Sequence, residues 1–284
     1  MTTAAVEAGT RSRRRRTSPE RSLAYGVAVL ITLFMLFPLY LITISAIQPK
    51  SAIDFGYPRT LFPRQFSLDT LWFFLSYAGV LAALGRSLVV GLLTVVFALV
   101  LGIPAGYAIA RYSFRGRELI QVLLVSVRAF PLIVLAIPLA VIFIDWNLYD
   151  TVLSVALLHT AMALPFTVLI TSSVFIRVPV ELEEAAMSLG TSKLGAVLRV
   201  VLPLSLPGLA TAALFAFVLS WNEVFGAAVV TQQSRTLPAL VVNQLTSSLP
   251  SYQFAGGFAL TIPALAFIYF MRPYLFTAFR GTTR

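Results

Sequence analysis

The sequence predicts an all-α integral membrane protein with six transmembrane helices, and three observations support this fold class. Of the 284 residues, 58% are hydrophobic and only 11% are charged, and the mean hydropathy is +0.89. A soluble chain of this size needs a larger charged surface than 21 basic and 11 acidic residues provide. Long apolar runs recur along the chain, and the basic residues cluster between them. These features exclude an ordinary cytosolic enzyme.

Six apolar runs define the predicted helices when a crossing takes about 20 residues. Their approximate ranges are 24–47, 87–110, 119–144, 151–175, 206–230 and 254–273. Residues 1–22 are polar and arginine-rich, and we interpret them as a basic cytoplasmic tail because no cleavable signal peptide is evident. Residues 23–284 then form one transmembrane domain. Within the second helix, Gly91, Gly102 and Gly106 are expected to permit close helix packing.

The loop charges predict that both termini are cytoplasmic. Lys and Arg near helix ends favour the cytoplasmic side of a membrane. With the N-terminus inside, fifteen of the 21 basic residues fall in cytoplasmic segments. The net charge of +10 is expected to face anionic lipid rather than nucleic acid, because the bases form short clusters between long uncharged runs.

The residue inventory argues against catalysis by this chain. The sequence has no cysteine and a single histidine, His159, so it offers no thiolate nucleophile and no multi-histidine metal cluster. It also lacks the Gly-x-x-x-x-Gly-Lys-Ser/Thr phosphate-binding loop. We therefore expect no catalytic residue, no metal and no cofactor bound by this chain, and we expect His159 to make an interhelical contact.

The segment at residues 178–208, between the fourth and fifth helices, is predicted to form two short helices. Pro179 followed by acidic residues suits a helix start, and Gly190 suits its end. A second helix is expected over about 192–201, with Pro203 ending or kinking it. The result is a helix–turn–helix projection along the cytoplasmic membrane surface.

The residues of this segment resemble the EAA loop of ABC importer permease subunits. Seven defining positions match, namely Glu184, Ala185, Ala186, Gly190, Val200, Leu202 and Pro203. We call residues 178–208 the EAA-type loop. Elsewhere, Phe130-Pro131 and Trp221-Asn222-Glu223 are similar to the second, maltose-type permease subunit of carbohydrate importers. One departure is Leu189, where the family commonly has Asp before the loop glycine.

This resemblance implies a fold, partners and a cargo. The fold is that of a type I ABC importer permease, with a cytoplasmic coupling helix between helices 4 and 5. The implied partners are two ATP-binding subunits that hold ATP and Mg, a homologous second permease subunit and an extracytoplasmic solute-binding protein. The implied location is a bacterial-type plasma (inner) membrane, in contact with lipid. The implied cargo is an oligosaccharide or disaccharide, with glycerol-phosphate-type or other polar solutes as the alternative.

A secondary active transporter is the alternative from another functional class. Such a protein is expected to show internal repeats or several intramembrane acids. The sequence has no clear repeat, and Glu223 is the one candidate acid within the predicted spans. The permease interpretation therefore explains the sequence better.

The resemblance assigns coupling to the partner ATPases to six residues of the EAA-type loop. Ala185 and Ala186 permit close approach of a partner backbone, and Gly190 permits a sharp chain reversal. Glu184 offers an acceptor, and the remaining pair ties the loop to the fifth helix. The six residues are Glu184, Ala185, Ala186, Gly190, Leu202 and Pro203.

A substrate path is predicted near Arg128 and the Trp221-Asn222-Glu223 tripeptide. Arg128 lies about nine residues into the third predicted helix, roughly 13 Å along its axis. Charged groups at that depth usually face a cavity or a partner. Pairing with the sister subunit or snorkelling is the alternative for Arg128. For the tripeptide, the alternative is an interfacial aromatic or an interhelical hydrogen bond.

Overall fold

The protein is all-helical over the residues that the computed structural model describes, which are 19–55, 61–63, 65–244 and 248–280. Most of the predicted basic tail, residues 1–18, lies outside them. The first helix, α1, begins at Pro19 and therefore includes the last four residues assigned to that tail.

Within the described residues, five helices are long and apolar enough to cross a membrane, and a bent helix pair supplies a sixth crossing. The pair consists of α5 (Arg117–Ser126) with a 3₁₀ turn (Val127–Ala129), followed by α6 (Leu132–Asp145). The five single helices are α1 (Pro19–Ala46), α4 (Val80–Arg111), α7 (Val152–Ile176), α10 (Leu202–Asn222) and α13 (Pro250–Arg280).

The third crossing differs from the prediction of one continuous helix over residues 119–144. The two halves meet at an angle of 93°. The break falls at Phe130, whose backbone is extended with ψ of 131°, and Pro131 follows directly. A proline clashes sterically with a helical residue before it, and it has no N–H for the helix ladder. Arg128 consequently lies in the 3₁₀ turn before the break and not inside a regular helix.

The fifth crossing also differs from its predicted range of 206–230. Helix α10 ends at Asn222, because Glu223 has extended backbone angles and a separate short helix, α11 (Phe225–Val230), follows. The Glu223 carboxylate accepts hydrogen bonds from the N–H groups of Gly226 and Ala227 at 2.7 and 2.9 Å. A side-chain acceptor of this kind satisfies the free N–H groups at a helix start.

Two other crossings are longer than their predicted ranges. Helix α4 begins at Val80, seven residues before the predicted start, and includes Arg86. The charge is accommodated because Arg86 Nε donates to the carbonyl of Arg235 at 3.0 Å. Helix α13 continues past residue 273 with Arg272 inside it, where the guanidinium lies 4.1 Å from the centre of the Tyr269 ring.

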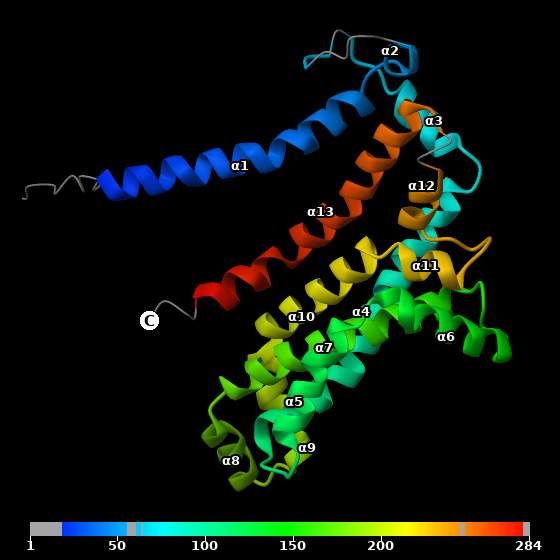
Figure 1. Cartoon of the computed structure of the whole chain (residues 1–284). Helices are drawn as coiled ribbons and strands as arrows, with labels where there is room; N and C mark the ends of the chain where they lie inside the picture. The colour runs from blue at the N-terminus through cyan, green and yellow to red at the C-terminus, as the bar shows by residue number, and fades with distance from the viewer. Residues whose placement is uncertain (1–18, 56–60, 64, 245–247, 281–284) are drawn as a thin grey trace, which may run out of the picture.

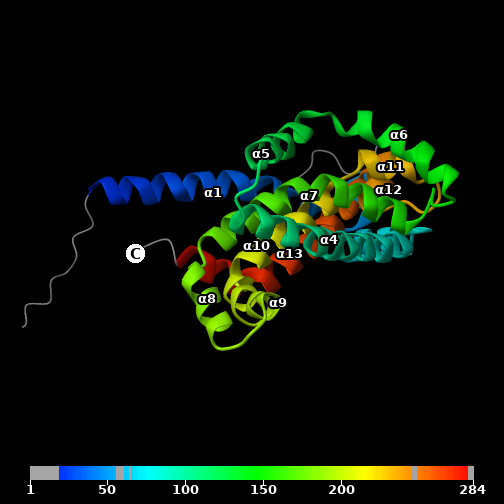
Figure 2. The same ribbon diagram turned by 90° about the horizontal axis from the view of Figure 1, so that it is seen from below.

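The helices form an elongated bundle around α4, α7 and α10 (Figure 1). The EAA-type loop, with α8 (Val180–Ser188) and α9 (Lys193–Ala196), lies at one end of the bundle. At the opposite end lie α2 (Lys50–Asp54), α3 (Asp69–Ser76) and α12 (Leu237–Gln244). Helix α13 packs between the bundle and α1, and α1 is exposed along most of its length. Helices α5 and α6 arch along one side of the bundle (Figure 2).

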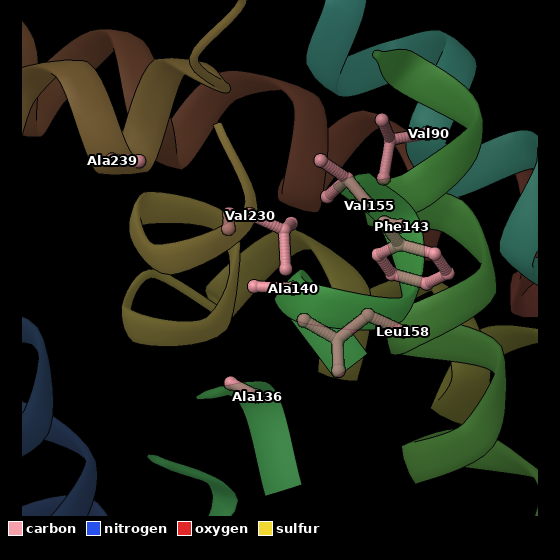
Figure 3. Packing of buried hydrophobic residues seen from close by; sticks show 9 residues of the cluster. Val90, Ala136, Ala140, Phe143, Val155, Leu158, Val230 and Ala239 are labelled. Carbon is pink, nitrogen blue, oxygen red and sulfur yellow. The ribbon is translucent and has the colours of Figure 1, made fainter. Parts of the chain in front are cut away.

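A buried apolar cluster joins α6 and α11 to the bundle. It includes Val90 of α4, Phe143 of α6, Leu158 of α7 and Val230 of α11, all at most 3% exposed (Figure 3). Figure 3 shows these side chains converging from separate elements. The second half of the broken crossing is therefore held by packing and not by helix continuity.

Glycines allow α4 to approach α7 closely, as predicted. A Cβ atom at Gly102 would lie 2.6 Å from the Thr167 methyl group, and one at Gly106 would overlap the Thr171 hydroxyl. The Thr171 hydroxyl also donates to the Gly102 carbonyl at 2.9 Å. The prediction of close packing at Gly102 and Gly106 is confirmed, and these contacts make α4 and α7 one packed unit.

Replacing Gly106 with alanine is expected to lower the free energy of unfolding by about 1–3 kcal/mol, because the added methyl group overpacks the α4–α7 contact. Gly85→Ala is the matched control in the same helix, because nothing lies within 4 Å of a Cβ there. Alanine at Gly85 is expected to stabilise the helix by about 0.5–1 kcal/mol. Thermal unfolding of the purified protein in detergent compares the two. Equal thermal unfolding midpoints for Gly106→Ala and Gly85→Ala would contradict the idea that Gly106 is needed for the close contact of α4 with α7.

Candidate functional site

The EAA-type loop begins with α8 (Val180–Ser188), which starts directly after Pro179 as predicted from the sequence. Glu181 and Glu183 lie in its first turn, where carboxylates are favourable. The chain reverses at Gly190, whose φ of +89° is in the left-handed region. The Gly190 N–H donates to the Met187 carbonyl at 2.9 Å. The predicted helix stop at Gly190 is confirmed.

The second half of the loop differs from the prediction at Pro203. Ser192 caps α9 (Lys193–Ala196) by accepting from the Gly195 N–H at 3.2 Å. A π-helical turn (Val197–Val201) then leads directly into α10, with Pro203 in the first turn of that helix. Pro203 therefore does not end the helical run, which continues through it into α10. The wider turn before it accommodates a residue that has no N–H to contribute.

The six predicted coupling residues mostly face away from the protein. Glu184, Ala185, Gly190 and Pro203 are exposed, and Ala186 and Leu202 are half-buried. Exposed apolar side chains surround them, and Leu189, at the position where the resemblance predicts Asp, is 88% exposed. The other exposed large apolar residues of the loop are Val180, Leu182, Met187, Leu194, Leu198, Leu204 and Leu206. The loop thus presents an apolar surface together with small residues and a carboxylate.

Sequence reasoning missed Glu183, the neighbour of Glu184. Glu183 is only 4% exposed and lies against the end of α4. Its carboxylate accepts a hydrogen bond from the Tyr107 hydroxyl, and it forms an ion pair with Arg111 at 3.3 Å. Arg111 Nη2 also donates to the carbonyl of Val178 at 2.9 Å. The signal in the sequence was the spacing of Tyr107 and Arg111, because residues four apart share one face of a helix.

Arg128 lies at the break in the third crossing and borders two adjoining hollows. Its guanidinium is 3.1 Å from the centre of the Phe166 ring. The first hollow, of about 550 Å³, is almost wholly apolar and includes Phe130, Pro138 and Leu158 among its lining residues. The second, of about 490 Å³, is an open groove lined also by Asn222 and Glu223. The broken helix thus places a cation beside the end of α10.

The predicted tripeptide divides into three different environments. Trp221 is 3% exposed, and its indole N–H donates to the Leu260 carbonyl of α13 at 2.9 Å. Trp221 also stacks on Phe217, and it is not among the residues that line the groove. Asn222 is exposed in the groove, where its amide donates to the Val218 carbonyl at 2.9 Å. Of the three tripeptide residues, only Asn222 therefore has an exposed polar side chain at the groove, where Arg128 also lies.

Glu223 belongs to a buried hydrogen-bond network behind the groove. His159 Nε2 lies 2.9 Å from the Glu223 carboxylate, and His159 Nδ1 lies 2.8 Å from the Ser220 hydroxyl. The Ser220 hydroxyl is 3.3 Å from that of Thr94. The network links α4, α7 and α10 and reaches α11 through the two N–H groups that Glu223 caps. The predicted interhelical contact of His159 is confirmed.

Asp150 holds the segment that follows α11, at the end of the bundle opposite the EAA-type loop. Its Oδ1 accepts from the N–H groups of Gln232, Gln233 and Ser234 at 2.9, 3.1 and 2.8 Å. Burial acts to raise the pKa of the Asp150 carboxyl, but these three hydrogen bonds outweigh it and lower that pKa below its ordinary value. The attachment is fully formed at neutral pH and is lost only as pH falls through the lowered pKa.

Metal-binding groups do not gather in the described part of the chain. No three His, Asp or Glu residues lie together there in a way that would hold a metal ion.

Comparisons with known proteins agree with this geometry. Residues 98–275 match the family model described as binding-protein-dependent transport system inner membrane component. The trehalose transport system permease protein SugB of Mycobacterium tuberculosis is 33% identical over 256 residues, which cover 85% of this chain and 90% of that protein. The diacetylchitobiose uptake system permease protein DasC of Streptomyces coelicolor is 32% identical, with 74% and 77% covered.

Solved structures show the same fold. A chain from the crystal structure of a bacterial ABC transporter that imports the acidic polysaccharide alginate superposes with a TM-score of 0.70 at 20% identity. The superposition covers 91% of this chain and 99% of that one. A chain of the methionine transporter MetNI gives a TM-score of 0.55 over 74% of this chain, at 18% identity.

The fold and the EAA-type loop together define a multi-pass membrane protein with the type I ABC importer permease architecture. The chain belongs to the family of binding-protein-dependent transport system inner membrane components. This membership does not support the alternative of a secondary active transporter.

Proposed function

We propose that this chain is one permease subunit of an ATP-driven, binding-protein-dependent importer for a sugar. The observation that carries the proposal is the EAA-type loop, which projects a small-residue and apolar surface from the end of the bundle. The chain has no nucleotide-binding motif of its own, so the energy must enter through such a surface. The relatives named for trehalose and diacetylchitobiose support a disaccharide or oligosaccharide as cargo.

The coupling role rests on the six predicted loop residues. Ala185 and Ala186 let the backbone of an ATPase subunit approach α8 closely, and Glu184 accepts hydrogen bonds from that partner. Gly190 sets the angle between α8 and α9. Leu202 and Pro203 continue the loop into α10. ATP-bound and nucleotide-free states of the ATPases then favour different loop positions, which shifts the balance between inward-facing and outward-facing bundles.

The proposed assembly contains two ATP-binding subunits, a homologous second permease subunit and an extracytoplasmic solute-binding protein. ATP and Mg bind to the ATPase subunits, and this chain holds no cofactor. The chain lies in a bacterial-type inner membrane with both termini on the cytoplasmic side. The alginate transporter, solved with a pentasaccharide-bound periplasmic protein, supports a partner of that kind.

Affinity purification in mild detergent tests this assembly. The tagged chain is expected to recover an ATPase and a second permease, and the complex is expected to hydrolyse ATP faster when its solute-binding protein and sugar are added. A stable preparation that contains this chain alone and does not respond to ATP would contradict the proposal.

The groove between the broken third crossing and the end of α10 is proposed as part of the solute path. Arg128 and Asn222 supply polar groups there, and Phe166 and Phe215 supply aromatic surface. Aromatic faces stack on sugar rings, and amide groups bond their hydroxyls. In this proposal Trp221 and Glu223 serve the path indirectly, because both are buried in interhelical contacts.

An anionic sugar derivative is the second candidate cargo, favoured by the position of Arg128. A relative from Agrobacterium fabrum, 32% identical, is named for sulfoquinovosyl glycerol transport. Arg128→Ala is expected to raise the KM for an anionic sugar by about tenfold, the equivalent of one charged hydrogen bond, while a neutral disaccharide is little affected. Uptake into proteoliposomes measures both.

The control for this substitution is Arg115→Ala, at an exposed arginine in the turn before α5. Equal losses for neutral and anionic sugars would show that the Arg128 charge does not select cargo. Loss of complex assembly alone would make Arg128 a structural residue.

A further inference from the structure

The EAA-type loop is covalently joined to the bundle at both ends, since residues 177–179 connect it to α7 and the π-helical turn leads into α10. A third attachment is a side-chain contact that joins α8 to the end of α4, and it depends on a single buried carboxylate. We infer that Glu183 is a positioning residue that fixes α8 to α4 through Arg111 and Tyr107, so that a force on the exposed loop moves α4 and α7. This inference rests on the proposed function.

The geometry distinguishes Glu183 from the other carboxylates of α8. The Glu183 and Arg111 side chains are 5% and 7% exposed, whereas Glu181 and Glu184 are exposed. Both Glu183 oxygens are engaged by α4, one by the Tyr107 hydroxyl and one by the Arg111 guanidinium. A buried charge that loses its partner is strongly destabilising, so this contact holds the two elements together.

Arg111 strengthens the attachment by bonding the chain just before α8. Its second contact is with the Val178 carbonyl, so one guanidinium joins both the entry to α8 and the first turn of that helix. Tyr107 packs edge-on against Phe175 near the end of α7, with ring centres 5.7 Å apart. The attachment therefore includes α7 as well as α4.

A buried apolar cluster brings the end of α4 into contact with both the start and the end of the loop. Phe175 and Val178 precede α8, and Val201 lies in the turn before α10. These residues form one buried cluster, on which Tyr107 of α4 packs. Because α4 and α7 are already locked together by the contacts at Gly102 and Gly106, displacement of α8 moves them as one body. Without the Glu183 contact, α8 would keep its chain connection to α7 and the apolar cluster but would lose its ion pair with α4.

The test compares Glu183→Gln with Glu181→Gln, which removes an exposed carboxylate from the same helix turn. Hydrogen exchange of the purified chain gives the first readout. Glu183→Gln is expected to speed amide exchange over residues 178–189 by about tenfold, because local opening becomes easier. Glu181→Gln is expected to leave that exchange unchanged. Unchanged exchange in Glu183→Gln would overturn the inference.

Stimulated ATP hydrolysis by the assembled complex gives the second readout. Glu183→Gln is expected to lower the stimulation by sugar-loaded binding protein about tenfold while the ATPase still copurifies, because the loop loses its fixed position. Tyr107→Phe, which removes one hydrogen bond, is expected to lower it about threefold. The double substitution Glu183→Arg with Arg111→Glu restores opposite charges and is expected to recover most of the stimulation.

The outcomes separate this inference from the proposed function. Normal stimulation in Glu183→Gln, in a complex that contains the ATPase, would overturn the positioning role and leave the importer assignment intact. Equal loss in Glu181→Gln would show that any α8 carboxylate suffices and would also overturn it. A wild-type chain that recovers no ATPase would overturn the proposed function, and with it the role in coupling. The exchange measurement would still decide whether Glu183 fixes the loop.

Discussion

Replacing Gly190 with proline is expected to abolish sugar-stimulated ATP hydrolysis while the protein still inserts into the membrane. Proline fixes φ near −65°, whereas Gly190 has a φ of +89°. The substitution also removes the N–H that donates to Met187. The chain reversal between α8 and α9 cannot then form, and the coupling surface loses its shape. ATPase assays of the reconstituted complex measure the stimulation, and membrane fractionation checks insertion.

A glycine in another turn supplies the control. Gly116 has a φ of +90° and open space around it, as Gly190 does, but it lies in the turn before α5. Alanine at either position is strained by about 1–2 kcal/mol. Gly190→Ala is expected to lower stimulation, and Gly116→Ala is expected to preserve it. Asparagine tolerates positive φ, so Gly190→Asn is expected to retain most of the stimulation. If both alanine variants were equally impaired, the coupling role of Gly190 would be wrong.

The second large effect is expected for Glu223→Ala, which should destabilise the folded protein. The Glu223 carboxylate accepts from two backbone N–H groups and lies within hydrogen-bond distance of His159. Each buried polar group left without a partner lowers the free energy of unfolding by about 1–3 kcal/mol. Removal of the carboxylate is therefore expected to cost several times as much as an ordinary surface substitution. A fall in the thermal unfolding midpoint of the purified protein measures the effect.

Neighbouring substitutions test whether the network is responsible. Asn222→Ala removes an exposed amide beside Glu223 and is expected to change the free energy of unfolding by less than about 0.5 kcal/mol. His159→Ala is also expected to lower the free energy of unfolding strongly. The variant that carries both Glu223→Ala and His159→Ala is expected to lose less free energy of unfolding than the sum of the two single losses, because both residues act in one network. Strict additivity would argue that Glu223 and His159 stabilise the protein independently.

The positions of the membrane-crossing helices could be predicted from the sequence, because a helix that crosses a membrane must be long and mostly apolar. The sequence could not identify the broken helix, since proline does not break most crossings in this protein. Pro38, Pro104 and Pro165 all lie inside continuous helices. Neighbouring helices and local adjustments satisfy the backbone around such prolines. Whether Pro131 interrupts its helix depends on how α6 packs against α11. This packing cannot be predicted from the residues around Pro131.

In the EAA-type loop, too, some features can be predicted from the sequence and others depend on packing. Pro179 and Gly190 mark the ends of α8 through their backbone preferences, which the sequence states directly. Which of the adjacent carboxylates is buried depends on the rotation of α8 relative to α4. The resemblance drew attention to Glu184, while the burial of Glu183 follows from the position of Arg111, 72 residues earlier in the chain.

The break in the third crossing has a consequence for hydration. Extended backbone at Phe130 and Pro131 leaves peptide groups outside the helical ladder, and Phe130 is 60% exposed. Hydrocarbon cannot satisfy such groups, so non-helical backbone at membrane depth persists only against protein or water. We therefore expect the groove beside Arg128 to be wet. The hydroxyl groups of a solute that enters the groove can then stay hydrogen-bonded to water. The solute thereby avoids the free-energy cost of leaving polar groups without partners in a dry interior.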